Sequence, residues 1–217
     1  MRLISILVRV TIAATLLLAA CGPSGSRVPT TGGSASSPSP SSTQTSSPSE
    51  TPVSVEPPVP VESSPPGDIP DDTQFVPYHS KKDGWTVTIP EGWSRTRTGT
   101  TVTFTDKLNT VQVDARPGDP VTVAGVKKTD VPELKRITRA FKLVSVTKVA
   151  LPAGPAVLIS YQANSDPNVV TGKQYRLDVL RYVVFHGGTR TTLTLLSPVG
   201  ADNVDPWRIV TESLKAA

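Results

Sequence analysis

The residue types that most often catalyse reactions or bind metals are few in this chain. It contains one cysteine, Cys21, and two histidines, His79 and His186. A metal site needs three or four clustered ligands, but the two histidines lie more than a hundred residues apart in the sequence. We therefore predict no metal ligand, no catalytic residue and no cofactor. Because a Ser-His-Asp triad needs no fixed spacing, a hydrolase stays open as the third alternative, although no Gly-x-Ser-x-Gly motif supports one.

Cys21 follows a segment with the pattern of an export signal. Two arginines precede the apolar run Val10–Ala20, as in a secretory signal, and this run is shorter than the roughly 20 apolar residues of a membrane-spanning helix. Its end, Leu18–Gly22, resembles the bacterial lipobox. That resemblance implies cleavage between Ala20 and Cys21, a diacylglyceryl group on the Cys21 sulfur and acyl chains such as palmitate. Two or three acyl chains anchor a protein stably, whereas one holds it only marginally.

Two other interpretations of Cys21 remain open. The cut of an ordinary signal peptide could fall beside a cysteine, or the thiol could be a nucleophile or metal ligand. The last role needs a basic partner or further ligands in a rigid pocket, whereas Cys21 begins a tract rich in proline and serine. We therefore expect an exported protein, lipid-anchored through Cys21 to the outer face of the cytoplasmic membrane.

The composition divides the chain after residue 73. Residues 1–20 are the predicted signal peptide, and residues 21–73 hold twelve of the 22 prolines with dense serine and threonine. Such a tract cannot bury enough apolar surface to offset the entropy of ordering, which predicts a disordered linker. Residues 74–217 are long enough for one domain. The linker carries one arginine against six acidic residues, a net −5, and the domain 19 basic against 12 acidic residues, a net +7.

Alternating apolar residues dominate the domain and predict strands. In 85–89, Trp85, Val87 and Ile89 fall on one face. A turn at 106–109 would join two strands into a hairpin, and His-Gly-Gly at 186–188 would join the last two strands. The predicted strands are 85–89, 101–105, 110–115, 143–149, 156–161, 175–185 and 191–196.

Two segments have helical spacing instead. Segment 130–142 contains Leu134, Ile137 and Phe141 at that spacing, with Asp130 as N-cap and Glu133 completing a capping box. Segment 204–217 has Asp205 as cap and Pro206 as the first helical residue, with Trp207, Val210 and Leu214 on its inner face. Many antiparallel strands and two helices predict an α+β domain.

Two surface features could bind a partner. On a helix, Lys135, Arg139 and Lys142 would share a face, with Arg136 beside it, and this basic patch could meet anionic headgroups or envelope polymers. The alternative is a solvated outer face. Trp93, after the turn Glu91–Gly92, could line a groove or close the end of the sheet, whereas Trp85 and Trp207 should be core. Export argues against a nucleic-acid partner.

Two stretches carry a family resemblance. FVPYHSKKDGWTVTIPEGW, residues 75–93, resembles the opening of PsbP-like domains, and TLTLLSPVGADNVDPWRIVTESLK, residues 192–215, resembles their closing strand and last helix. With the lipobox and the linker, the chain is similar to the LpqN/LpqT class of actinobacterial envelope lipoproteins. The resemblance implies an antiparallel sheet with helices on both faces, an α-β-α sandwich, and a binding, assembly or accessory role with no shared catalytic residues.

Three functions follow as alternatives. The first is a non-catalytic binding or accessory module for an envelope partner, the second a carrier or sensor of lipid or glycolipid with an apolar pocket, and the third an envelope hydrolase. The sequence separates them poorly, because inward-facing strand residues look alike whether they fill a core or line a pocket.

Overall fold

The structure is a computed structural model that describes residues 55–64 and 66–216. The predicted signal peptide, its cleavage site at Ala20 and Cys21, and the linker up to residue 54 lie outside the described residues. The elements are β1 (Phe75–His79), β2 (Thr86–Pro90), β3 (Ser94–Thr98), β4 (Thr101–Asp106), β5 (Asn109–Pro117), α1 (Val123–Ile137), β6 (Lys142–Leu151), β7 (Gly154–Asn164), β8 (Arg176–His186), β9 (Thr189–Pro198) and α2 (Val204–Ser213).

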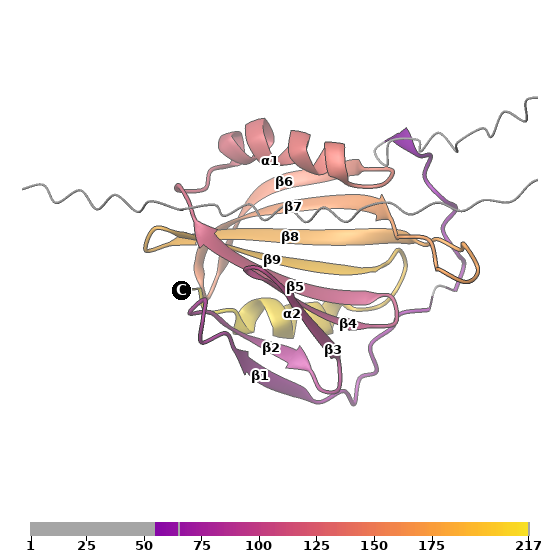
Figure 1. Cartoon of the computed structure of the whole chain (residues 1–217), viewed down its shortest axis with the longest axis horizontal. Helices are drawn as coiled ribbons and strands as arrows, with labels where there is room; N and C mark the ends of the chain where they lie inside the picture. Colours follow the sequence, from indigo (N-terminus) through magenta and orange to yellow (C-terminus); the bar gives the residue numbers. More distant parts are fainter. Residues whose placement is uncertain (1–54, 65, 217) are drawn as a thin grey trace, which may run out of the picture. The chain divides into compact units, whose positions relative to one another are not determined.

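The strands form two antiparallel sheets. β1 pairs with β2, and the other strands form one sheet in the order β3-β4-β5-β9-β8-β7-β6 (Figure 1). Asp106 pairs with Asn109 across the predicted β4–β5 turn. Gly187 and Gly188, between β8 and β9, have φ values of 54° and 81°, which glycine adopts at little cost and which a two-residue hairpin turn requires. Both predicted turns are confirmed.

Each helix packs on its own set of buried strand residues. Val126 and Leu134 of α1 lie in a cluster with residues of β7 and β8, among them Ile159 and Val179. Trp207 and Val210 of α2 lie in a second cluster with Trp85, which precedes β2, and with residues of the two sheets. These are Val87, Val102, Val111, Val113, Leu193 and Leu195. The predicted α+β class, a mainly antiparallel sheet with two helices, is confirmed, as is the burial of Trp85 and Trp207, 1% and 7% exposed.

The predicted strands are all present, with ends that differ by up to three residues, but β1 and β3 were not predicted. In β3, the sequence SRTRT is exposed throughout, so it carries no apolar alternation. β1 reads FVPYH, and its Pro77 is unfavourable inside a strand. β1 pairs only with β2, and an edge position of this kind tolerates proline.

The predicted start of the first helix is wrong. α1 begins at Val123, after Thr122, whose side chain accepts a hydrogen bond from the Gly125 N–H at 3.0 Å. Asp130 lies inside the helix and pairs with Arg190. The spacing of Asp130 and Glu133 imitates a capping box, which is why residue 130 was predicted as the start.

The predicted end of this helix is also wrong. α1 stops at Ile137, because Thr138 is extended, at φ −101° and ψ 129°, and Ala140 has φ 45°. Ile137 is 51% exposed and is not part of the inner face. Arg139 and Lys142 lie beyond the helix.

The second helix begins close to the prediction. Asn203 is its N-cap residue, although its side chain makes no capping bond, and Asp205 lies in the first turn. The predicted cap at Asp205 is therefore wrong by two residues. Trp207 and Val210 form the predicted inner face. Leu214 is also buried but follows the helix, which ends at Ser213 and not at residue 217.

Residues 55–73, predicted as disordered linker, contact the domain at several described positions, among them Glu56, Glu62 and Ile69. Figure 1 shows this segment passing along one end of the large sheet, from the α1 side to β1. We call residues 56–62 the strap and residues 67–69 the anchor. Ile69 of the anchor is 5% exposed and belongs to the cluster around α2. The prediction missed this contact because a single isoleucine among prolines and acidic residues gives no periodic signal.

None of the helices in the described residues is long and apolar enough to cross a membrane.

Candidate functional site

A groove of about 580 Å³ lies between α2 and the large sheet and is here called the α2 groove. Trp207 and Val204 line it from the helix, and Leu180 and Tyr182 of β8 form its apolar floor. Polar groups lie among them. These are Ser160, Asp178, Ser197, Arg208 and Thr211.

The groove exists because β8 is less completely covered than β9 on this face of the large sheet. Leu195 and Leu193 on β9 are fully buried. Their register partners on β8, Leu180 and Tyr182, are only half-buried. Trp207 of α2 lines the groove beside these two half-buried residues. Their apolar side chains are therefore partly open to solvent, as in a binding groove.

The rim of the groove combines apolar and charged side chains. Val204 and Val144 are 75% and 61% exposed. Arg208 forms ion pairs with Asp205 at 3.1 Å and with Glu212 at 3.6 Å. On the floor, burial raises the pKa of Tyr182, so its hydroxyl stays a neutral hydrogen-bonding group. The groove can therefore hold an apolar group while offering hydrogen bonds at its edges.

Trp93 lines a different hollow. Its ring is half-buried and meets Trp207 edge-on, with ring centroids 6.3 Å apart. It borders a cavity of about 470 Å³ together with Tyr78 and Phe104. The Arg95 guanidinium lies 5.2 Å from the centre of the Tyr78 ring. Trp93 thus stands at a hollow, but the binding of a ligand there stays a prediction.

The four residues of the predicted basic patch do not share a helix face. Lys135 and Arg136 lie in the last turn of α1, whereas Arg139 follows the helix and Lys142 begins β6. Arg136 is bound by Glu133 at 2.6 Å. Hydrogen bonds to that carboxylate raise the pKa of Arg136, and the guanidinium lowers the pKa of Glu133. Binding of these residues to an anionic surface stays a prediction.

Arg139 is bound by two carboxylates. It contacts Glu56 of the strap at 2.7 Å and Asp166 at 3.1 Å. Hydrogen bonds to Glu56 and then to Asp166 raise its pKa. Much of its positive charge is therefore already compensated within the chain.

The two histidines lie on the surface, on different sheets. His79 is exposed on β1, with Nδ1 3.0 Å from the Thr86 hydroxyl. His186 is exposed at the end of β8. Within residues 55–64 and 66–216, no group of three or more His, Cys, Asp or Glu side chains could hold a metal ion.

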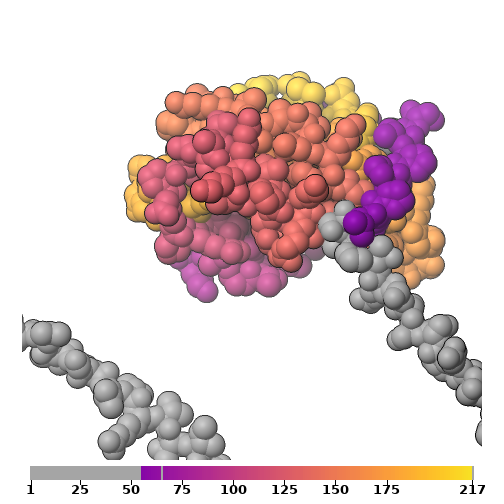
Figure 2. All heavy atoms as spheres, turned by 90° about the horizontal axis from the view of Figure 1, so that it is seen from above, coloured from indigo at the N-terminus to yellow at the C-terminus, as the bar shows by residue number. Residues whose placement is uncertain are grey.

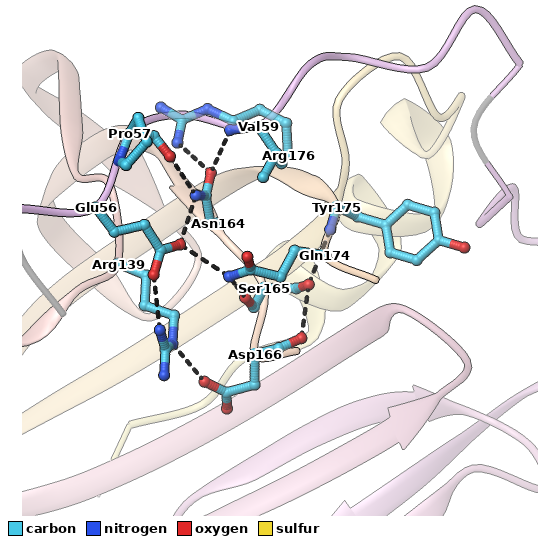
Figure 3. Close-up of polar contacts among 10 residues, drawn as sticks. All are labelled: Glu56, Pro57, Val59, Arg139, Asn164, Ser165, Asp166, Gln174, Tyr175 and Arg176. Atoms are coloured by element: carbon cyan, nitrogen blue, oxygen red, sulfur yellow. Dashed lines mark hydrogen bonds and ion pairs between the residues drawn. The ribbon is translucent and has the colours of Figure 1, made fainter. Parts of the chain in front are cut away.

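Sequence reasoning missed a polar network around the strap (Figure 3). Asn164 ends β7, and Gln174 precedes β8. Both donate to the Glu56 carboxylate, at 2.6 Å and 2.8 Å. The available signal was the pair Glu56 and Glu62 within a proline-rich stretch, but such spacings are common in acidic linkers.

The structure is similar to several solved structures at low sequence identity. Cyanobacterial PsbP from Synechocystis matches with 17% identity over 71% of this chain and 100% of that chain, at a TM-score of 0.49. LpqN, involved in cell envelope biogenesis of Mycobacterium tuberculosis, matches with 15% identity over 67% and 91%, at 0.40. The Ran-binding protein Mog1p of Saccharomyces cerevisiae matches with 9% identity over 59% and 79%, at 0.41.

No protein-family model and no curated protein matches the chain. Because the TM-scores are all below 0.5, no partner or activity is transferred from these structures. The functional argument therefore rests on the residues of this chain.

Proposed function

We propose that this chain is a lipoprotein of the bacterial cell envelope, and that its domain is a non-catalytic module that binds a protein partner in the α2 groove. The α2 groove is the observation that carries the proposal. It presents Leu180, Tyr182 and Trp207 in an open hollow whose volume of about 580 Å³ suits a few apolar side chains.

The rim favours a protein over a small enclosed ligand. Val204 and Val144 extend the apolar lining of the groove to its exposed rim, and the ion pairs of Arg208 with Asp205 and Glu212 border it. An apolar centre with a polar, charged rim is the usual composition of a protein interface.

The proposal of a membrane anchor rests on the sequence. Export and lipidation at Cys21 rest on the lipobox-like Leu18–Gly22, and two or more acyl chains would hold the protein at the outer face of the cytoplasmic membrane. The linker would let the domain reach partners away from the bilayer surface.

We also infer the α-β-α arrangement. Val183 and Val184 are neighbours on β8, so their side chains point to opposite faces of the sheet. Val183 packs in the cluster of α1 and Val184 in that of α2. This assignment supports helices on both faces, with the α2 groove on one of them.

Photo-crosslinking in intact cells of the native host tests the partner. A photoreactive phenylalanine analogue replaces Val204 at the rim, and a matched control replaces Val170, which is 87% exposed and lies outside the groove lining. We expect one reproducible protein adduct from position 204 and none from position 170. The same scatter of adducts at both positions would contradict the proposal.

The anchor has its own test. Cys21→Ser should move the chain out of the membrane fraction and abolish the adduct at position 204. Unchanged fractionation of the variant would contradict lipid anchoring, whatever the crosslinks show.

A lipid or glycolipid carrier is the second candidate. It is favoured by the apolar floor and by a volume within the roughly 300–1,000 Å³ of small-molecule sites. Native mass spectrometry of the protein purified from its host should then show a bound lipid that Leu180→Arg removes. Repeated absence of bound lipid in the unsubstituted protein would rule this candidate out.

A further inference from the structure

The Glu56 carboxylate is bound by three side chains that come from separate parts of the domain. Arg139 Nη1, Asn164 Nδ2 and Gln174 Nε2 donate to it at 2.7, 2.6 and 2.8 Å (Figure 3). Although partial burial acts to raise the pKa of Glu56, the hydrogen bonds from Asn164, Gln174 and Arg139 outweigh it, and the pKa is lowered. The site therefore selects a carboxylate in its charged form.

Asn164 also binds the backbone of the strap. Its Nδ2 donates to the Pro57 carbonyl at 2.8 Å, and its Oδ1 accepts from the Val59 N–H at 3.1 Å. A single side-chain amide thus pairs with the backbone of the strap, in addition to its bond with the Glu56 carboxylate. This is the way in which main-chain hydrogen bonds give affinity in peptide recognition.

Asn164 is held in place by the domain itself. It is 5% exposed, and Arg176 Nη1 donates both to its Oδ1 at 3.1 Å and to the Ala140 carbonyl at 2.8 Å. Because Arg176 and Ala140 belong to the domain, the amide keeps its orientation independently of the strap. A pre-oriented donor and acceptor loses little entropy when a peptide binds.

A second charge pair lies farther along the strap. Lys173 Nζ contacts Glu62 at 2.6 Å and lies 4.5 Å from the centre of the Tyr175 ring. The two acidic residues of the strap thus face two basic residues of the domain. Figure 2 shows the strap lying against the orange segment that contains the β7–β8 connection.

The Arg176 guanidinium beside this site is only partly hydrogen-bonded. Arg176 is 4% exposed, and its Nη2 is buried without a hydrogen-bond partner in the part of the chain that the structure describes. A buried donor without a partner costs free energy. The site therefore has more capacity to bind a polar or anionic group than the strap uses.

Little apolar burial holds the strap. Val61 is 54% exposed and the adjoining Val55 is 66% exposed. The strap could leave without opening the core, because Ile69 holds the chain farther on.

We propose that Arg139, Asn164, Lys173 and Gln174 form a binding site for an acidic, proline-containing peptide segment of a partner protein, which the strap occupies in cis. The ligand presents a glutamate in an extended chain. The carbonyl of the residue after this glutamate accepts from Asn164, and the N–H two residues after that carbonyl donates to Asn164. A second glutamate six residues after the first pairs with Lys173. This site is distinct from the α2 groove and does not rest on the function proposed for the groove.

Competition with the strap determines how the site behaves. The strap is covalently linked, so its effective concentration is high and a free peptide competes poorly with it. A partner must then supply additional contacts, and its binding would release the strap.

Fluorescence anisotropy with the full chain tests the site. The probe is a labelled peptide of residues 54–64, SVEPPVPVESS. We expect Glu56→Gln to bind the probe at least about tenfold more tightly than the unsubstituted chain, since the charged hydrogen bonds that hold the strap are weakened. Adding Arg139→Gln to this variant should remove the gain.

Two controls make the result decisive. A probe with glutamine at the position of Glu56 should not bind. A second variant replaces residues 56–62 with glycine and serine in the full chain, which leaves the site empty; it should bind the probe at least as tightly as Glu56→Gln. Failure of this variant to bind, with cooperative unfolding retained, overturns the proposal, and so does equal binding of the two probes.

Discussion

The anchor and the strap are bound in the same way but by different parts of the domain. Asn203 Nδ2 donates to the Gly67 carbonyl at 2.9 Å and its Oδ1 accepts from the Ile69 N–H at 2.8 Å. Asn164 makes the equivalent pair of bonds with Pro57 and Val59. In both segments, an asparagine amide joins the carbonyl of one residue to the N–H two residues later.

What differs is the side chains that these segments present. Ile69 of the anchor is 5% exposed within the core, whereas Val61 of the strap is 54% exposed. Charged contacts hold the strap instead, through Glu56 and Glu62. The same backbone recognition therefore serves folding where an apolar side chain follows it, and resembles ligand binding where only polar contacts follow.

The largest expected effect comes from the anchor. Ile69→Ala should lower the free energy of unfolding by about 2–4 kcal/mol, because it removes buried methyl groups and leaves a cavity. Val61→Ala in the strap should change it by less than about 0.5 kcal/mol. Urea denaturation of the two full-length variants measures the difference, and equal losses would erase the distinction between anchor and strap.

Asn203→Ala comes next. It leaves the Ile69 N–H without its side-chain partner and removes one of two donors to the Gly67 carbonyl, which keeps Asn109 Nδ2 at 2.7 Å. We expect a loss of about 1–3 kcal/mol in unfolding free energy. The matched control is Gln174→Ala, which removes a donor to the strap and should leave the unfolding free energy within about 0.5 kcal/mol. A larger loss in the control than in Asn203→Ala would reverse the assignment.

Acid should release the strap and leave the anchor in place. The pKa of Glu56 is lowered from its ordinary value of 4.5, so its stabilising contribution is complete above that value and is lost as the pH falls through the lowered pKa. Arg139 stays charged throughout, and Asp166, 93% exposed, shares it. In an NMR titration, the Val59 amide signal should move below pH 4.5 while that of Ile69 stays fixed.

The control for the titration is Glu56→Gln, in which the Val59 signal should lose this acid transition. A transition of the same midpoint in the variant would assign it to another carboxyl, such as Asp166.

The smallest effect is expected at the edge of the strap. Lys173 and Glu62 are 49% and 36% exposed, and exposed ion pairs contribute about 0–1 kcal/mol. Lys173→Ala should therefore weaken the binding of the 54–64 peptide to the Glu56→Gln chain by no more than about fivefold. A complete loss of binding would show that Lys173, and not the Glu56 site, dominates recognition.

The sequence predicted those elements whose side chains alternate or repeat regularly. Spacing alone predicts the buried face of β2 from Val87 and Ile89, and that of α2 from Trp207 and Val210. β3 has no apolar face to reveal it, and the start of α1 was predicted too late because the Asp130–Glu133 pair looks like a capping box.

The candidate sites depended on information that spacing does not contain. Leu180 and Leu195 look alike in sequence, and only the position of α2 decides that one lines a groove and the other is core. Asn164 and Glu56 are more than a hundred residues apart, so no local pattern could bring them together. Trp93 was predicted either to line a groove or to close the end of the sheet, because it directly follows the turn Glu91–Gly92.

Native-state hydrogen exchange at the Val59 and Ile69 amides tests the central claim most directly, that the strap is a displaceable occupant and the anchor part of the fold. Each amide donates to an asparagine Oδ1, at 3.1 Å and 2.8 Å. We predict that Ile69 exchanges only through global unfolding, and Val59 through a local opening of lower free energy that depends little on denaturant. Val59 protection equal to that of Ile69 would contradict the claim.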